Sequence, residues 1–185
     1  MTGFTLGLLQ AEPVSGHRDL VPPVVLEALT HLDWLDQVCV VEIDPAVSDT
    51  AATEAAFELR PDVLANCVVV GGSRAGEERI AACVALSHTR VDVNRVVRKR
   101  LDVRSASFLP MERAVEETGM EYGGITPVGL PAGWSLFVDS RVIEQPVVIT
   151  GSGIRASKLL LPGRLVGQLP GAEIVEGLAT EVGRD

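Results

Sequence analysis

Residues 119–133 read Gly-Met-Glu-Tyr-Gly-Gly-Ile-Thr-Pro-Val-Gly-Leu-Pro-Ala-Gly, so five glycines and two prolines interrupt an apolar run. This composition disfavours a helix, because Gly has a large conformational entropy to lose and Pro has no N–H to donate. The segment is also too apolar for a solvated linker. We therefore predict a loop held against a core, where a ligand can approach bare backbone and meet N–H and C=O groups.

Apolar and β-branched runs on both sides of this loop predict strands, and periodic apolar positions predict helices. We expect strands at 38–43, 63–70, 80–86, 106–109, 135–138, 146–150 and 159–161, with a turn at 71–76. Helices are expected at 20–35, at 50–59, after a capping Asp92, and from Pro110 to Gly119. Tight turns join more of these strands than long helical crossovers do. The pattern therefore favours an α+β fold with a mixed, largely antiparallel, curved and barrel-like sheet surrounded by helices.

Length and composition indicate one folded domain. The chain has 185 residues, of which 46% are hydrophobic, which suits a single domain with a real core. We expect residues 1–185 to form this domain, with 1–60 as an N-terminal elaboration of a core at 60–178. We expect no membrane contact, because no apolar run reaches the length of a membrane span and no basic signal region opens the chain. Three cysteines without C-x-x-C spacing fit a reducing, cytoplasmic environment.

The charge is acidic overall but unevenly distributed. A net charge of −9 argues against a general nucleic-acid binder, because phosphate contacts require Lys and Arg. Six of the sixteen basic residues nevertheless lie between Arg90 and Arg104. This cluster is either a solvated helix face or a patch that contacts phosphates, and the sequence leaves both interpretations open.

No arrangement of nucleophile, base and metal ligands is evident. The three histidines stand apart, there is no G-x-S-x-G elbow, and no His pair has i, i+4 spacing, so we expect neither a metal nor a cofactor. Cys67 and Cys83 lie in apolar runs and are more typical of structural cysteines than of nucleophiles. An unrelated hydrolase that uses Cys67 as its nucleophile is therefore a less favoured hypothesis.

A second glycine-rich segment runs from Thr150 to Lys158 after a predicted strand. Successive glycines can turn several N–H groups toward one anion, and Arg155 and Lys158 add positive charge. The segment is neither a dinucleotide fingerprint nor a P-loop. A hairpin turn with solvated basic residues is the alternative interpretation.

An ordered set of short motifs extends over residues 60–178. In chain order it comprises Val91-Asp92-Val93-Asn94 up to Leu101, Ser105-Ala106-Ser107-Phe108, Ala114-Val115 up to Thr118-Gly119, Gly123-Gly124-Ile125-Thr126-Pro127-Val128-Gly129-Leu130-Pro131, Val138-Asp139 and Gly151-Ser152-Gly153. This set resembles the YbaK/prolyl-tRNA synthetase-associated domain family. The order of the motifs is far more specific than any one Gly pair.

The resemblance implies a compact α+β domain that hydrolyses mischarged aminoacyl-tRNA, here in the freestanding, trans-editing form. A second, hydrolytic pocket restores fidelity because one binding site separates small amino acids poorly, a methylene being worth only about 1–3 kcal/mol. The ribose hydroxyl beside the ester can assist the attacking water, so the protein need not provide a nucleophile. The implied partners are the 3′ end of aminoacyl-tRNA and an aminoacyl-tRNA synthetase. The edited amino acid and the oligomeric state stay open.

The resemblance also implies the position of the pocket. The catalytic positions would be Asn66, Gly124 and Lys158, and backbone groups of residues 123–125 would hold the carbonyl or the water and stabilise the oxyanion. A structural turn beneath the sheet is the alternative role of these glycines. The implied substrate-binding residues are Gly123, Ile125, Thr126, Pro127, Gly151, Ser152, Gly153 and Arg155.

The chain departs from the family at two of these positions. Many members carry a pocket lysine where this chain has Asn66, and an acidic residue near the position of Lys158. Asparagine keeps two donors and an acceptor but carries no charge. We hypothesise that Lys158 partly restores the positive charge from the opposite wall. The alternative function is a catalytically weak or inactive module that binds aminoacyl-tRNA or a nucleotide in the same pocket.

Overall fold

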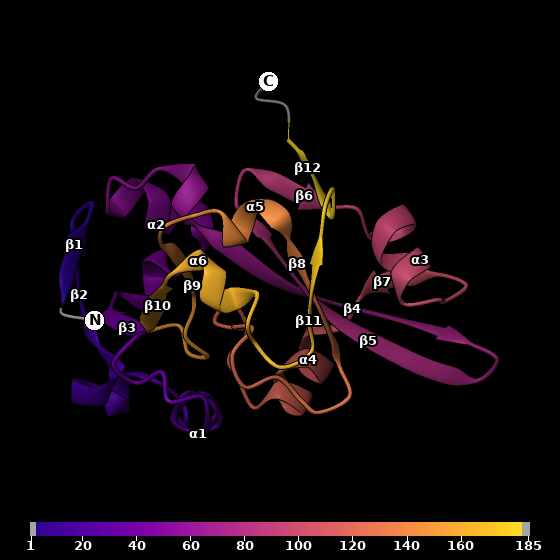
Figure 1. The fold of residues 1–185 in the computed structure, drawn as a ribbon, viewed down its shortest axis with the longest axis horizontal. Helices are drawn as coiled ribbons and strands as arrows, with labels where there is room; N and C mark the ends of the chain where they lie inside the picture. The colour runs from indigo at the N-terminus through magenta and orange to yellow at the C-terminus, as the bar shows by residue number, and fades with distance from the viewer. Residues whose placement is uncertain (1–2, 183–185) are drawn as a thin grey trace.

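A long antiparallel hairpin, formed by β4 (Ala65–Arg74) and β5 (Glu77–Leu86), runs through the molecule. The computed structural model describes residues 3–182. Figure 1 shows the tip of this hairpin at one end of the molecule and β1 and β2 at the other. Ala75 and Gly76 connect the strands with φ angles of 53° and 85°, as the favoured two-residue hairpin turn requires.

The expected turn at 71–76 is wrong at its first four residues, because β4 continues to Arg74. Gly71 and Gly72 serve a close approach of chains instead. A Cβ on Gly72 would lie 2.3 Å from the Ser105 carbonyl oxygen, where β7 (Ala106–Phe108) joins β4. Glycine inside a strand here admits the neighbouring strand without a clash.

The strands form two five-stranded sheets, in the orders β1-β2-β3-β10-β9 and β11-β8-β5-β4-β7, and a two-stranded pair β12-β6. All pairs are antiparallel except β5–β8 and β8–β11, and a bridge between Leu64 and Ile149 connects the sheets. The expected mixed, largely antiparallel, curved sheet with surrounding helices is confirmed. The remaining strands are β1 (Phe4–Leu6), β2 (Leu9–Pro13), β3 (Cys39–Glu42), β6 (Thr89–Val91), β8 (Ser135–Asp139), β9 (Val148–Gly151), β10 (Ser157–Leu161), β11 (Ala172–Val175) and β12 (Ala179–Glu181).

The helices are short and follow the predicted signals. Asp92 accepts a hydrogen bond from the Arg95 N–H and caps a π-helical turn, and Gly119 ends α4 in the left-handed conformation with φ of 66°. None of the helices within residues 3–182 combines the length and apolar character needed to cross a membrane. The helices are α1 (Pro23–His31), α2 (Thr50–Ala56), α3 (Arg98–Arg100), α4 (Met111–Thr118), α5 (Ser140–Ile143) and α6 (Gly163–Val166), with short turns at Val14–Gly16, Arg18–Leu20, Pro45–Val47, Pro61–Val63 and Val93–Val97.

The first helix is shorter than the expected 20–35. It begins after Pro22 and ends before Asp33, whose left-handed backbone (φ 57°) cannot continue a helix. Val25 and Leu29 on this helix are fully buried against the main core cluster, which includes Val84 of β5 and Leu159 of β10. The helix therefore covers residues from both five-stranded sheets and holds them together.

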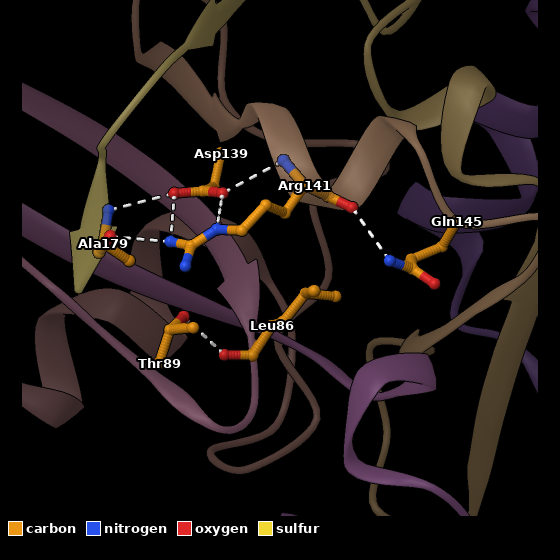
Figure 2. Close-up of polar contacts among 6 residues, drawn as sticks. All are labelled: Leu86, Thr89, Asp139, Arg141, Gln145 and Ala179. Atoms are coloured by element: carbon orange, nitrogen blue, oxygen red, sulfur yellow. Dashed lines mark hydrogen bonds and ion pairs between the residues drawn. The ribbon is translucent and has the colours of Figure 1, made fainter. Parts of the chain in front are cut away.

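An ion pair between the buried Asp139 and the half-buried Arg141 connects the end of β8 to β12, as Figure 2 shows. Asp139 is fully buried, and its carboxylate accepts hydrogen bonds from the Arg141 guanidinium at 2.8 and 2.9 Å and from the Ala179 N–H at 3.0 Å. Burial opposes ionisation, but these donors hold the pKa of Asp139 below its usual value. This network is a structural fastening between distant parts of the chain.

Candidate functional site

A pocket of about 540 Å³ opens between the two five-stranded sheets. Five segments contribute to it: the start of α2, the first half of β4, the junction of β7 and α4, the loop before residue 126, and the β9–β10 connection. Its walls combine an apolar majority with a few polar and charged groups. The lining residues are Ser48, Asp49, Thr50, Leu64, Ala65, Asn66, Cys67, Val68, Val69, Phe108, Leu109, Met111, Ala114, Tyr122, Gly123, Ile125, Ile149, Thr150, Gly151, Arg155 and Lys158.

One wall of the pocket is the edge of β4. Successive residues from Leu64 to Val69 line it, whereas a sheet face would present only alternate ones. This stretch lies between the Leu64–Ile149 bridge and the hydrogen bond from the Leu109 N–H to the Val69 carbonyl, and no described strand pairs with it on that side. Backbone groups of alternate residues point to the same edge of a strand. The Val69 carbonyl points at Leu109 on this edge. The N–H and C=O of Cys67, two residues earlier, therefore point to the same edge and into the pocket.

Lys158 brings a buried ammonium group to the pocket from β10. Its side chain is only 7% exposed, and Nζ donates a hydrogen bond of 2.6 Å to the Ser48 carbonyl oxygen. Burial, and then the nearby Arg155 charge, lower the pKa of Lys158 to about 8, against a weaker opposing effect of Asp49. The group is therefore charged at neutral pH but loses its proton under mildly alkaline conditions.

Asn66 lies on the β4 wall and is held by the same turn that binds Lys158. Its Oδ1 accepts a hydrogen bond of 2.6 Å from the Thr50 hydroxyl, so its Nδ2 donors are left for a ligand. The segment from Ser48 to Thr50 thus anchors both predicted polar groups of the pocket.

Arg155 lies over the first glycine-rich loop. Its backbone N–H donates to Glu121 Oε2 at 2.6 Å, and its Nη2 donates to the Pro45 carbonyl at 2.9 Å. A Cβ on Gly123 would lie 2.8 Å from Arg155 Nη1, and Gly123 has φ of 81°. Only glycine therefore fits at position 123 without moving the guanidinium.

Gly124 and Gly151 lie at the contact between the two glycine-rich loops. The Gly124 N–H donates to the Glu121 carbonyl at 2.9 Å, and its carbonyl accepts from the Gly153 N–H at 2.7 Å. A Cβ on Gly151 would lie 2.3 Å from the Gly124 oxygen. These glycines allow the backbones of the two loops to pack directly together, and this packing supports the pocket wall.

The structure brings some of the sequence-predicted residues together and leaves others outside the lining. Thr126 is buried outside the pocket. The Ser152 hydroxyl accepts a hydrogen bond from the Ser157 hydroxyl at 2.7 Å and donates one to the Ser157 carbonyl at 3.0 Å. The predicted residues that line the pocket are Asn66, Gly123, Ile125, Gly151, Arg155 and Lys158; those that do not are Gly124, Thr126, Pro127, Ser152 and Gly153.

Three hydroxyl oxygens in the described part of the chain are buried without a hydrogen-bond partner: those of Ser48, Thr126 and Thr150. Ser48 and Thr150 are lining residues of the pocket. Buried polar atoms are normally hydrogen-bonded, so an unpartnered pair beside one cavity marks its polar part.

Sequence reasoning did not identify several residues of the site. Ser48 and Asp49 received no role, and Thr50 was expected only as the first residue of a helix. Phe108, Met111 and Tyr122 line the pocket although they are exposed. Tyr122 was the available signal, because it is the only tyrosine of the chain and stands within the glycine-rich loop.

The thiol at position 67 faces unfavourable conditions for nucleophilic chemistry. Burial raises the pKa of Cys67 to about 12, so the thiol stays protonated near neutral pH. A protonated thiol is a poor nucleophile, which argues against the hypothesis of a hydrolase that uses Cys67.

The fold is shared with solved structures. The hypothetical protein APE2540 matches with a TM-score of 0.73 and 19% identity, over 85% of this chain and 99% of that one. A candidate trans-editing enzyme for prolyl tRNA synthetase matches with a TM-score of 0.69 and 16% identity, over 84% and 97%. A candidate signal transduction protein from Marinobacter aquaeolei matches at 0.56 and 22% identity, over 87% of this chain but 31% of its own.

The sequence gives the family. Residues 44–166 match the model of the aminoacyl-tRNA editing domain, which is about two thirds of the chain, and the chain belongs to this family. No curated protein matches it at a significant level. The matched range includes every lining residue of the pocket, from Ser48 to Lys158.

Proposed function

We propose that the protein is an aminoacyl-tRNA deacylase that edits mischarged tRNA in trans, in the cytoplasm. The observation that carries this proposal is the pocket. In a chain of the editing-domain family, the open edge of β4, Asn66 and the ammonium group of Lys158 all line this one pocket. An apolar cavity with a few fixed polar groups suits a substrate whose amino acid is recognised by shape.

The reaction is the hydrolysis of an activated ester. Water attacks the carbonyl carbon, the bond to the ribose oxygen breaks, and that oxygen takes up a proton, which leaves a free amino acid and an uncharged tRNA. The vicinal ribose hydroxyl assists the water. The protein therefore contributes orientation and stabilisation of the developing negative charge.

The lining residues can share these tasks. In this proposal the N–H of Cys67 at the β4 edge, and those of Gly123 and Ile125, would hold the carbonyl oxygen. Asn66 Nδ2 would orient the carbonyl or the water, and the charge of Lys158 would stabilise the oxyanion or the terminal phosphate. Gly124, whose N–H is bound to Glu121, would support this wall by packing.

A binding module with the same pocket is the second candidate. Asn66 favours it, because a neutral amide stands where many relatives have a lysine. The partner of either form would be the 3′ end of aminoacyl-tRNA. A prolyl-tRNA synthetase, which a structural neighbour is described as serving, is the natural candidate to deliver it.

The test is a panel of separately charged tRNAs incubated with the protein at neutral pH, with release of the amino acid as the readout. We expect turnover of at least one mischarged tRNA. Lys158→Ala should reduce its rate about 10²-fold or more, in the range of a lost oxyanion-stabilising group. Leu8→Ala, an exposed change in the β1–β2 connection, is the control.

Binding of charged tRNA without turnover of any of them would favour the binding module. A Lys158→Ala variant as fast as the parent would remove Lys158 from the chemistry, while leaving the deacylase itself in place.

A further inference from the structure

Three exposed apolar side chains border the pocket: Phe108, Met111 and Tyr122, which we call the rim. Their exposed fractions are 62%, 49% and 59%. They account for half of the large apolar side chains that are exposed in residues 3–182, the others being Leu8, Ile174 and Val182. A gathering of such exposed apolar side chains beside a pocket marks a surface that another molecule covers.

The rim is built from two separate segments. Phe108 ends β7 and Met111 begins α4, whereas Tyr122 belongs to the glycine-rich loop that follows α4. The chain turns from one segment to the other through the eight residues of α4, which is held to β5 by the pair between Arg113 and Glu78. The two aromatic side chains therefore flank α4, with Phe108 before its start and Tyr122 after its end.

A basic cluster lies at the other end of β7. Arg98, Lys99 and Arg104 line two small hollows near the hairpin tip, and none of the three forms an ion pair with a carboxylate among the described residues. In Figure 1, α3 and β7 are neighbours at the right-hand side of the molecule.

The strand β7 connects this cluster to the rim. It is the outer strand of its sheet, and from Arg104 to Phe108 the chain advances about 13 Å at strand spacing. Ser105 and Ser107 are exposed along it. The surface thus offers free cations, then a polar strand edge, then aromatic rings, and finally the pocket with Arg155 and Lys158.

We propose that the rim stacks the unpaired bases at the 3′ end of an RNA, while the phosphates behind them follow β7 to Arg98, Lys99 and Arg104. This inference rests on the proposed function. Charge complementarity selects the occupant: cations lie at both ends of the path in a chain whose net charge is −9, which suits a polyanion that carries flat bases.

The test measures binding of uncharged RNA, so it does not depend on hydrolysis. The probe is a fluorescein-labelled RNA hairpin with an unpaired CCA 3′ end, compared by anisotropy with the same hairpin cut to a blunt end. We expect Phe108→Ala and Tyr122→Ala each to weaken binding of the unpaired end by about tenfold or more, as a lost base–aromatic stack does. Binding of the blunt hairpin should stay unchanged.

Matched variants make the result specific. Phe108→Trp and Tyr122→Phe keep a ring and should keep the affinity, and Leu8→Ala removes an exposed apolar side chain elsewhere without effect. Circular dichroism and thermal melting establish that each variant is folded. Equal affinity of the parent and both alanine variants, equal losses on the blunt hairpin, or no binding of the parent to either hairpin would overturn the proposal.

Two further outcomes separate this inference from the proposed function. If the parent protein binds the unpaired end through the rim but hydrolyses no charged tRNA, the role of the rim is supported and the deacylase function is contradicted. If the alanine variants hydrolyse charged tRNA with an unchanged KM, the role of the rim is contradicted and the deacylase function is supported. A dimer that Phe108→Ala dissociates would assign the rim to a second copy of the chain and also overturn the proposal.

Discussion

Lys158 is a charged side chain in a strand that otherwise reads Ser-Leu-Leu-Leu, and all five residues of that strand are buried. One hydrogen bond, to the Ser48 carbonyl, replaces the water that an exposed ammonium would have. This is incomplete compensation, which explains why burial lowers its pKa to about 8. A group with this pKa makes the stability of the protein depend on pH.

The sign of that dependence follows from the two states. The ordinary pKa of 10.5 applies in the unfolded chain, so between about pH 8 and pH 10.5 the unfolded chain carries the extra proton. Stability should therefore rise with pH in this window. The Lys158→Met variant has no such titration. The free energy of unfolding of the parent should increase relative to this variant by up to about 3 kcal/mol between about pH 7 and about pH 10.

Urea unfolding of both proteins at the two pH values measures this difference, and all other titrating groups cancel in the comparison. Parallel stability curves for the parent and Lys158→Met would contradict a lowered pKa at this position.

At this scale the sequence was informative about side chains and uninformative about their anchors. Asn66, Arg155 and Lys158 were predicted to meet, and all three line the pocket. Ser48 was not found, since it binds Lys158 through a main-chain carbonyl that every residue possesses, 110 positions away. Such a contact leaves no trace in the residue type.

Among the elements, long apolar strands were predictable and short polar ones were not. The runs that became β4, β5, β8 and β10 carry their own burial pattern, whereas β1, β11 and β12 have few buried residues and are defined by their partners. The glycine pair at 71–72 indicated a turn because the sequence does not show that another strand packs there.

The basic cluster at the start of β7 gives a prediction at the scale of elements. Arg98→Glu together with Lys99→Glu should weaken binding of the RNA hairpin and flatten its dependence on salt. Each lost phosphate contact removes about 0.7–0.9 from the slope of log K against log salt concentration. Anisotropy titrations over a range of salt concentrations measure both effects.

Arg18→Glu together with Arg164→Glu is the control, because both residues are exposed and the net charge changes by the same amount. An unchanged slope for the Arg98 and Lys99 variant would indicate that the basic cluster is a solvated helix face and does not contact phosphates.

Over the whole molecule, the first and last thirds of the chain are interleaved. The editing-domain match begins at residue 44, yet β3, which precedes it, pairs with β10 inside the matched range. The preceding α1 packs on the main core cluster. Residues 1–60 as an elaboration of one domain stay a prediction, and this interleaving is its physical basis.

A single domain should unfold in one step, and the two tryptophans allow a test. Trp34 lies between α1 and β3, and Trp134 lies just before β8. In Trp34→Phe and Trp134→Phe variants the remaining fluorophore reports one region, and denaturant curves from fluorescence and circular dichroism should coincide within each variant. An earlier transition seen only by Trp34 would indicate that the N-terminal part folds separately.

The segment Ser48–Thr50, which holds both Lys158 and Asn66, affects how the site withstands mutation. Lys158 is held by the backbone of Ser48, so its anchor survives any substitution at position 48 that preserves the turn. Asn66 is held by the hydroxyl of Thr50, so a single codon change there releases it. We therefore expect the position of the Lys158 ammonium group to tolerate substitution of its anchor residue better than the position of the Asn66 amide does.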